Sequence, residues 1–87
     1  SVGLYRLPAG ADDDQRPHAE EEVYLVLEGR GRFRLGDEAF EVVPGHLLTA
    51  PARVEHHFHS IEEELLLLVF FVPAEGSAED EGGTTSD

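Results

Sequence analysis

The sequence contains no cysteine, no lysine, no methionine and no tryptophan. Without cysteine, disulfide bonds and thiolate ligands are excluded, so a bound metal ion would have to be held by histidine and carboxylate side chains. Long apolar runs are missing too, because the longest one, residues 65–72, falls far short of the roughly 20 residues that a transmembrane helix needs. No charged segment followed by an apolar one opens the chain, and we therefore expect a cytoplasmic protein.

Positive charge is also scarce. Only six residues are basic, all of them arginine, against 19 acidic residues, which gives a net charge of −13. Such a surface repels nucleic acid and anionic membranes, so we expect neither as a partner. An acidic chain without lysine is typical of salt-adapted organisms. We therefore interpret the charge as a halophilic adaptation rather than as a patch for a cationic partner.

Short apolar runs separated by glycine, proline and aspartate predict an all-β fold, either a sandwich or a small barrel. Residues 29–31 and 36–38 are expected to form tight turns, because glycine supplies the positive φ angles that hairpins require. The acidic residues 62–64 are expected to form a turn before the last strand. The expected strands are 3–7, 23–27, 31–35, 39–43, 46–50, 54–58 and 64–72.

Residues 17–27 are open to a second interpretation. Proline in the first turn and acidic residues behind it are compatible with a helix, in which His18 and Glu22 would be i, i+4 neighbours. Val23, Tyr24 and Val26 instead favour a strand, and glycine stops the apolar run after five residues. We expect the strand and keep the helix as the alternative.

The chain is expected to hold one domain, residues 1–73, followed by a tail over residues 74–87. The tail has no apolar residue larger than alanine, so we predict a flexible acidic segment. The run 65–72 is apolar at every position, which predicts a strand that is covered on both faces. In a chain this small the expected cover is a second copy, and we predict a homodimer formed through this strand.

Alternation along the strands assigns a face to each candidate site residue. Val54 and Phe58 carry His56 inward, whereas His57 and His59 are expected to point to solvent or to the rim. Glu22 and Tyr24 share a face, and a buried carboxylate and imidazole are costly unless they are paired or bound. Because four residues of straight strand span about 13 Å, His18 and Glu22 can share an ion only if residues 19–21 form a corner.

These residues belong to two spaced motifs that resemble the cupin motifs. The first cupin motif has Gly, five residues, His-x-His, three or four residues, Glu, six residues and Gly. The second has Gly, five residues, Pro-x-Gly, two residues, His, three residues and Asn. This chain matches the first at Gly10, His18, Glu22 and Gly29 and the second at Gly45, Pro51 and His56, and it departs from them at Arg16, Arg53 and Ser60.

The resemblance covers about residues 3–73. It implies a small antiparallel β-barrel of the jelly-roll type, often dimeric, with a divalent metal ion in the barrel. Carried over by position, the implied ligands are His18, Glu22 and His56. A site of two histidines and one carboxylate suits Fe, Mn, Zn or Ni, with positions left open for another molecule.

Arg16 stands where the family has its first histidine. A guanidinium has no lone pair and cannot bind a cation, so two outcomes are open. Either Arg16 points to solvent and leaves the metal site intact, which we prefer, or it pairs with Glu22 and replaces the metal, which would make Arg16 part of a ligand-binding pocket.

Three functions follow from this site. The first is a metal-dependent enzyme, an oxidoreductase or isomerase, acting on an oxygen-rich small molecule, with Tyr24 as a candidate for proton transfer. The second is a pocket that binds a sugar or a carboxylate without turnover. The third is a structural or regulatory dimer in which the pocket has lost its function. No second acid or base selects one reaction, and the fold hosts many chemistries.

Overall fold

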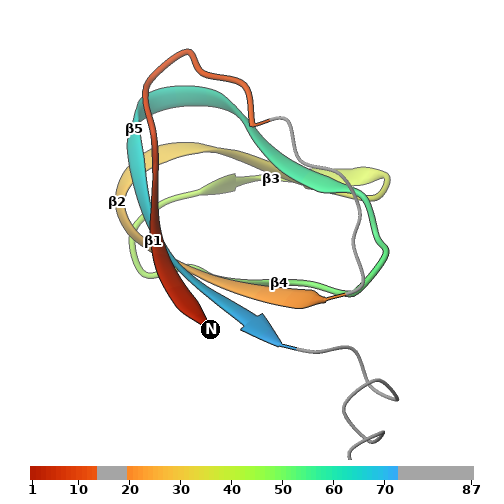
Figure 1. The fold of residues 1–87 in the computed structure, drawn as a ribbon. Helices are drawn as coiled ribbons and strands as arrows, with labels where there is room; N and C mark the ends of the chain where they lie inside the picture. The colour runs from red at the N-terminus through yellow and green to blue at the C-terminus, as the bar shows by residue number, and fades with distance from the viewer. Residues whose placement is uncertain (14–19, 73–87) are drawn as a thin grey trace, which may run out of the picture.

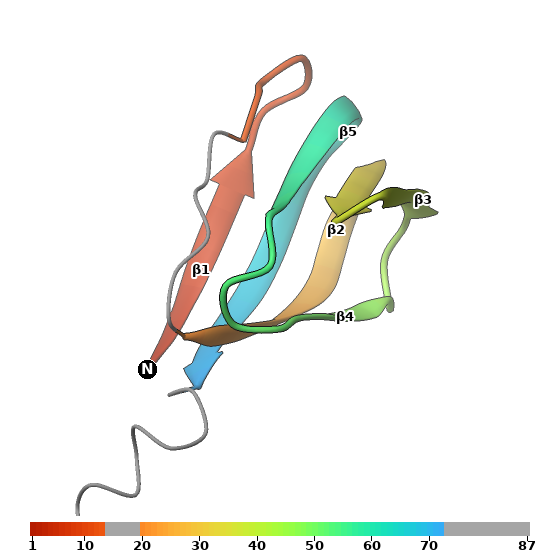
Figure 2. The ribbon, with the colours of Figure 1, turned by 90° about the vertical axis from the view of Figure 1, so that its right-hand side faces the viewer.

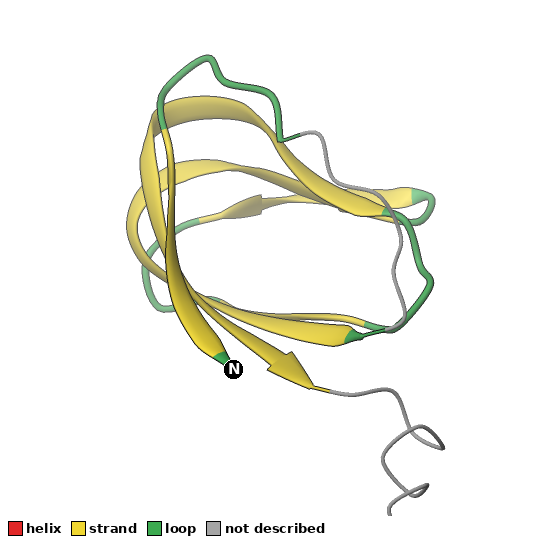
Figure 3. Cartoon of the chain, viewed as in Figure 1, coloured by secondary structure: helices red, strands yellow, loops and turns green. Residues whose placement is uncertain are grey.

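A computed structural model describes residues 1–13 and 20–72, which form a curved antiparallel sheet (Figure 1). Within these ranges every regular element is a strand (Figure 3), and none is a helix that could cross a membrane. Arg16, His18 and the tail predicted for residues 74–87 lie outside the described residues. The five strands are β1 (Val2–Leu7), β2 (Glu21–Leu35), β3 (Glu38–Val42), β4 (Leu47–Ala50) and β5 (His56–Val72).

The sheet is organised around the two long strands β2 and β5, which pair along most of their length. The strand order is β1-β5-β2-β3, and β4 also pairs with β2. The first part of β2 lies between β4 and the end of β5, whereas its second part lies between β3 and the start of β5. The ribbon curls so that β4 and β3 turn away from the plane of β1 and β5 (Figure 2). The all-β fold is therefore confirmed.

Irregularities in β2 and β5 allow each long strand to bend without ending. The pairing of β2 with β5 shifts in register at three places between Val26 and Arg32, and Gly29 has a φ of 100°. On β5, Ser60 has a φ of 50°. A bulge adds an unpaired residue and bends a strand while its ladder continues. The turns predicted at residues 29–31 and 62–64 are therefore wrong, since both segments lie inside strands.

The bulges also change which positions face inward. Tyr24 and Val26 are buried in the first part of β2, but Phe33 is buried in the second part. Phe58 is buried at the start of β5, and Leu65 after its irregularity. The register shifts insert an odd number of extra residues into each strand, one in β2 and three in β5. The inward positions therefore move between even and odd numbers, because side chains alternate with a period of two.

The structure decides two other expectations about local conformation. Leu35 pairs with Glu38 across Gly36 and Asp37, so the predicted turn at residues 36–38 is confirmed as a two-residue hairpin. The helix considered for residues 17–27 is contradicted in its described part, because β2 begins at Glu21. The β-branched and aromatic residues behind Glu22 decide the local structure there.

The core lies on the inner face of the curled sheet. The rings of Tyr24, Phe33 and Phe58 meet at its centre, with centroids 4.7 to 5.8 Å apart. Edge-to-face and tilted contacts of this kind add to the gain from burial. The other buried apolar residues are Leu7, Val26, Val42, Leu48, Ala50, Ile61, Leu65, Leu67 and Val69.

The outer face of β1, β5, β2 and β4 is apolar as well. Residues directly opposite one another on paired strands point to the same side, so the register defines two rows across the four strands. Leu4 and Leu47, at the two ends of one row, are each 67% exposed. We call these rows the apolar outer face: Leu4, Leu68, Leu25 and Leu47 in the first, and Val2, Phe70, Val23 and Thr49 in the second.

The outer face of the other part of the sheet carries basic side chains. Arg32 lies opposite His59 and Arg34 lies opposite His57, and we call these two pairs the basic rows. The rings of His57 and His59 are 5.4 Å apart, and both histidines are half-buried. They lie on the outer face of the sheet, as expected, while His56 points into the core.

Candidate metal centre

Glu22 and His56 meet inside the barrel although they are 34 positions apart. Glu22 is the second residue of β2, just after a bend at Glu20, and His56 is the first residue of β5. Glu22 is 1% exposed and His56 is 2% exposed. Glu22 Oε1 lies 3.0 Å from His56 Nε2. The structure therefore brings these two residues together on the inner face to which the sequence assigned them.

A backbone contact fixes the tautomer of His56. Its Nδ1 lies 2.9 Å from the carbonyl oxygen of Val54. Because a carbonyl oxygen only accepts, Nδ1 carries a proton and Nε2 is the atom left to face Glu22. Histidines that bind metals are oriented in the same way, with the second ring nitrogen donating to a carbonyl or carboxylate.

The turn that precedes His56 explains one departure from the cupin pattern. Residues 51–54 close through a hydrogen bond from the Val54 N–H to the carbonyl of Pro51. Arg53, which replaces the glycine of the motif, has a φ of 65°. Ser60, which replaces the asparagine, has a φ of 50°. The backbone thus keeps the left-handed geometry that glycine and asparagine tolerate best, even though both residues have changed.

Tyr24 completes a buried polar cluster with these two residues. Its hydroxyl donates a hydrogen bond to Glu22 Oε1, the same oxygen that faces His56. Contacts with Phe33 and Phe58 hold the Tyr24 ring, which is 1% exposed. The candidate for proton transfer is therefore in direct contact with a candidate metal ligand.

The positions of Glu22 and His56 fit a shared metal ion. An ion bound at about 2.1 Å from each of two ligand atoms, with a right angle between the two bonds, leaves those atoms about 3 Å apart, and Oε1 and Nε2 are 3.0 Å apart. Residues 1–13 and 20–72 contain no group of three or more His, Cys, Asp or Glu side chains placed to hold a metal. The third predicted ligand, His18, and the departing residue, Arg16, fall in the undescribed segment 14–19.

Sequence reasoning missed one buried residue near the site. Asp13 is 4% exposed and accepts hydrogen bonds from the Tyr5 hydroxyl, at 3.1 Å, and from the Phe58 N–H, at 3.0 Å. It therefore ties the loop after β1 to β5, two residues beyond His56. No signal in the sequence singled it out, because it sits in a run of three aspartates that is typical of a solvated turn.

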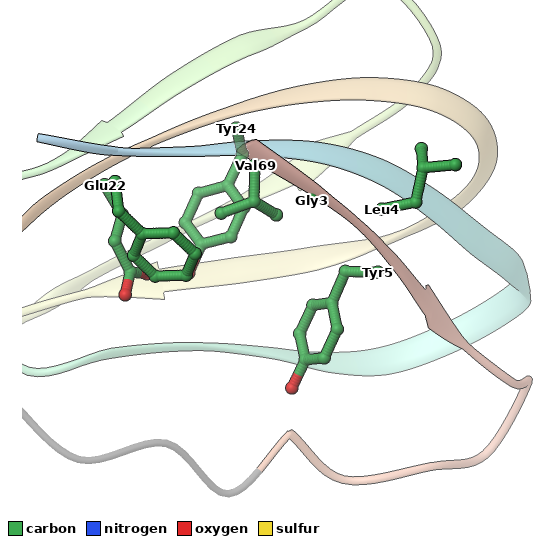
Figure 4. A pocket seen from close by; sticks show the side chains of 7 residues that line it. Gly3, Leu4, Tyr5, Glu22, Tyr24 and Val69 are labelled. Carbon is green, nitrogen blue, oxygen red and sulfur yellow. The ribbon is translucent and has the colours of Figure 1, made fainter. Parts of the chain in front are cut away.

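A cavity of about 280 Å³ adjoins the polar cluster (Figure 4). Glu22 and Tyr24 form part of its wall, and Tyr5 of β1 lines it as well. Burial, and then the charge of Asp13, raise the pKa of the Tyr5 phenol above its ordinary value. The Tyr5 hydroxyl therefore keeps its proton and its hydrogen bond to Asp13 at neutral pH.

The family assignment rests on a match that covers most of the chain. Residues 3–72 match the family model described as a cupin domain. The chain belongs to the cupin family. The family's fold agrees with the strand arrangement described above, and Glu22 and His56 both lie within the matched residues.

Several cupin relatives and structures are similar to this chain. An uncharacterized protein of Streptomyces coelicolor is 49% identical over 75 residues, which is 86% of this chain and 71% of the relative. The crystal structure of TT1209 from Thermus thermophilus is 32% identical, with a TM-score of 0.72 over 82% of this chain and 70% of that one. The DMSP lyase DddQ from Ruegeria pomeroyi shares the fold at 22% identity, with a TM-score of 0.77 over 86% of this chain and 39% of the lyase.

Proposed function

We propose that this cupin binds a divalent metal ion through His18, Glu22 and His56 and uses it to hold a small oxygen-bearing molecule. The Glu22–His56 contact carries the proposal. His56 donates its Nδ1 proton to the carbonyl oxygen of Val54, so its second ring nitrogen, Nε2, is the atom that lies 3.0 Å from Glu22 Oε1. Such a contact is stable only if a proton or a cation lies between the two groups. Iron, manganese, zinc or nickel would satisfy both at once.

The arrangement also supports catalysis by an oxidoreductase or isomerase. A bound divalent ion would supply Lewis-acid polarisation of an oxygen ligand. The chain itself contributes the Tyr24 hydroxyl, which lies against Glu22 and lines the cavity. Tyr24 can hold a proton at the edge of the cavity and give it to a bound molecule, while the surrounding aromatic rings exclude water.

A second candidate function needs no metal. Glu22 Oε1 already accepts a hydrogen bond from Tyr24, and a protonated His56 would supply another. With Arg16 paired to Glu22, the same pocket would bind a sugar or a carboxylate without turnover. This function predicts a protein that contains no metal when it is purified.

Elemental analysis separates the two functions. The protein is purified without an affinity tag, and its metal content is compared with those of His56→Ala and Arg16→His. The metal proposal expects close to one ion per chain, lost in His56→Ala. His57→Ala is the matched control, because His57 lies on the outer face and should keep the metal. A metal-free wild type in which Arg16→His gains an ion would instead favour the second function.

We also propose that two copies associate through the apolar outer face. Leu66, Leu68 and Phe70 of β5 point outward while Leu65 and Leu67 are buried, so the strand is apolar on both faces. The face spans four strands of a protein whose net charge is −13, and large apolar patches on such surfaces mark interaction sites. A self-complementary sheet face suits a closed twofold pair. The cytoplasmic location and the halophilic origin of the charge stay predictions.

A further inference from the structure

The cavity beside Glu22 has walls of a distinct chemical character. Val69 and Phe71 of β5 and the rings of Tyr5 and Tyr24 surround it, and Glu22 stands at one end. Its volume of about 280 Å³ lies just below the range for drug-sized ligand sites, about 300–1,000 Å³. The cavity therefore suits the apolar part of a small ligand whose polar part reaches Glu22.

Gly3 is the reason that this volume is open. It lies within β1 opposite the buried Val69, while its neighbours Val2 and Leu4 are exposed on the other face. A Cβ built at Gly3 would meet no atom within 4 Å. Glycine in the middle of a strand weakens the strand, and it often marks a place where a ligand approaches the backbone. A larger residue at this position would fill the cavity without a clash.

The neighbouring polar contacts keep the cavity in this shape. The Tyr5 hydroxyl is bound to Asp13, so the ring is held as a wall and does not swing into the space. Glu22 is the only charged side chain among the described lining residues, and the protein carries a net charge of −13. Both features disfavour an anionic ligand.

We propose that the ligand of this cupin is a small neutral molecule with two parts. Its oxygen-bearing head lies at Glu22 and His56, its branched aliphatic or phenyl tail fills the cavity, and Gly3 sets the largest tail that fits. The inference rests on the proposed function, because it takes the head to be held at the metal centre. It adds a specificity rule that the metal ligands alone do not supply.

Hydroxamic acids test this rule because they are uncharged in neutral solution and are available with different tails. They bind metals through two oxygens and release the N–OH proton to solvent as they do so, a step that is the same for every tail. We would titrate the metal-loaded protein calorimetrically with acetohydroxamic, isovalerohydroxamic and benzohydroxamic acid. Each carbon added to the tail should tighten binding about fourfold, the value for burial of one methylene group. Equal affinities for the acetyl and isovaleryl compounds in the wild type would overturn the inference.

Variants at Gly3 locate the effect. Gly3→Val should remove the gain from the longer tail, while metal content and affinity for acetohydroxamic acid stay unchanged, and Gly3→Ala should remove part of it. Val2→Leu is the matched control, since it adds bulk on the opposite face of the same strand and should keep the full gain. A Gly3→Val protein that still prefers the longer tail would contradict the assignment of the tail to this cavity.

A probe without a metal-binding head separates this inference from the proposed function. If the protein proves to contain no metal, isobutanol is titrated while the methyl NMR signals of Val69 are followed. Shifts in the wild type that are absent in Gly3→Val support the apolar cavity even though the metal proposal has failed. Unchanged Val69 signals in the wild type overturn the cavity as a binding site.

Discussion

The same two strands build two regions with opposite outer surfaces. In the apolar half, made of β1, β4, residues 21–26 of β2 and residues 65–72 of β5, the outer face is a sheet of leucine, valine and phenylalanine. In the basic half, made of β3, residues 31–35 of β2 and residues 56–59 of β5, the outer face carries the basic rows. Both halves nevertheless contribute to one core and one site.

The difference shows that a bulge can change which side chains of a continuous strand point inward and which point outward. Glu22 reaches the site from the apolar half and His56 from the basic half, and the residues between them reverse their inward positions at the bulges. A straight β2 would turn Phe33 outward and the arginines inward. The bulges therefore allow one half to carry an apolar outer face and the other a basic one without disturbing the shared site.

Gly29→Ala should distort the bulge that joins the two halves and cause the largest loss of stability. A Cβ at Gly29 would lie 2.1 Å from the backbone oxygen of Glu64, and the φ of 100° is unfavourable for alanine. Strain and overpacking together should lower the free energy of unfolding by about 3 kcal/mol, measured by urea denaturation. Gly36→Ala is the control, because its Cβ would meet no atom within 4 Å and should cost only about 1 kcal/mol. Equal losses in the two variants would contradict this explanation.

Leu68→Glu should separate the roles of the two outer faces. A charge placed in the middle of the apolar outer face would be buried by a partner copy, so the dissociation constant of the dimer should rise at least about a hundredfold, equivalent to about 2.7 kcal/mol. Light scattering across a dilution series measures it. Arg34→Glu, in the basic rows, should leave the oligomeric state unchanged. A wild-type protein that is monomeric at every concentration would refute the dimer.

Arg53→Gly, in the turn before β5, should raise the free energy of unfolding by about 1 kcal/mol. Its φ of 65° is costly for any residue with a Cβ, and glycine removes that cost. Thermal denaturation should show a higher midpoint for Arg53→Gly. Arg53→Lys keeps both the charge and the Cβ, so its midpoint should equal that of the wild type. A lower midpoint for Arg53→Gly would mean that the Arg53 side chain makes a larger contribution than the strain it introduces.

His59, in the basic half, should produce the smallest effect, a dependence of the free energy of unfolding on pH. Burial, and then repulsion from His57, Arg32 and Arg34, lower the pKa of His59, partly offset by Asp12. The unfolded chain therefore binds a proton near pH 6.5 that the folded protein does not, so stability falls as the pH drops below 6.5. Urea denaturation at pH 7.5 and 5.5 should show a smaller difference in His59→Gln. An unchanged difference would assign the effect to other groups.

Sequence reasoning predicted the strand content but not the strand length. Each of the seven expected strands overlaps one of the five observed strands, although residues 43, 46, 54 and 55 lie outside them. There are fewer observed strands because Gly29 and Gly31 form a bend inside β2 and the acidic residues 62–64 are exposed within β5. Glycine between two apolar runs is compatible with both a turn and a bulge. The choice depends on pairing with a strand more than 25 positions away, such as that of Arg30 with Glu63, which no local pattern records.

The inward placement of three candidate residues could be predicted from alternation. His56 lies between Val54 and Phe58, and Glu22 and Tyr24 share the parity of Val26. In the structure Glu22 contacts both Tyr24 and His56. Asp13 was missed because its burial depends on the Phe58 N–H and the Tyr5 hydroxyl, which approach it only in the folded chain. The roles of His18 and Arg16 stay predictions.

The continuity of β2 and β5 also determines how this chain can fold. Glu21 pairs with Val72 and Leu35 with His56, so the ladder between β2 and β5 joins residues that are far apart in the sequence at both of its ends. Contacts this distant in sequence make folding slow, on the order of milliseconds to seconds. Glu22 and His56 come from different halves, so their contact requires both halves to be in place.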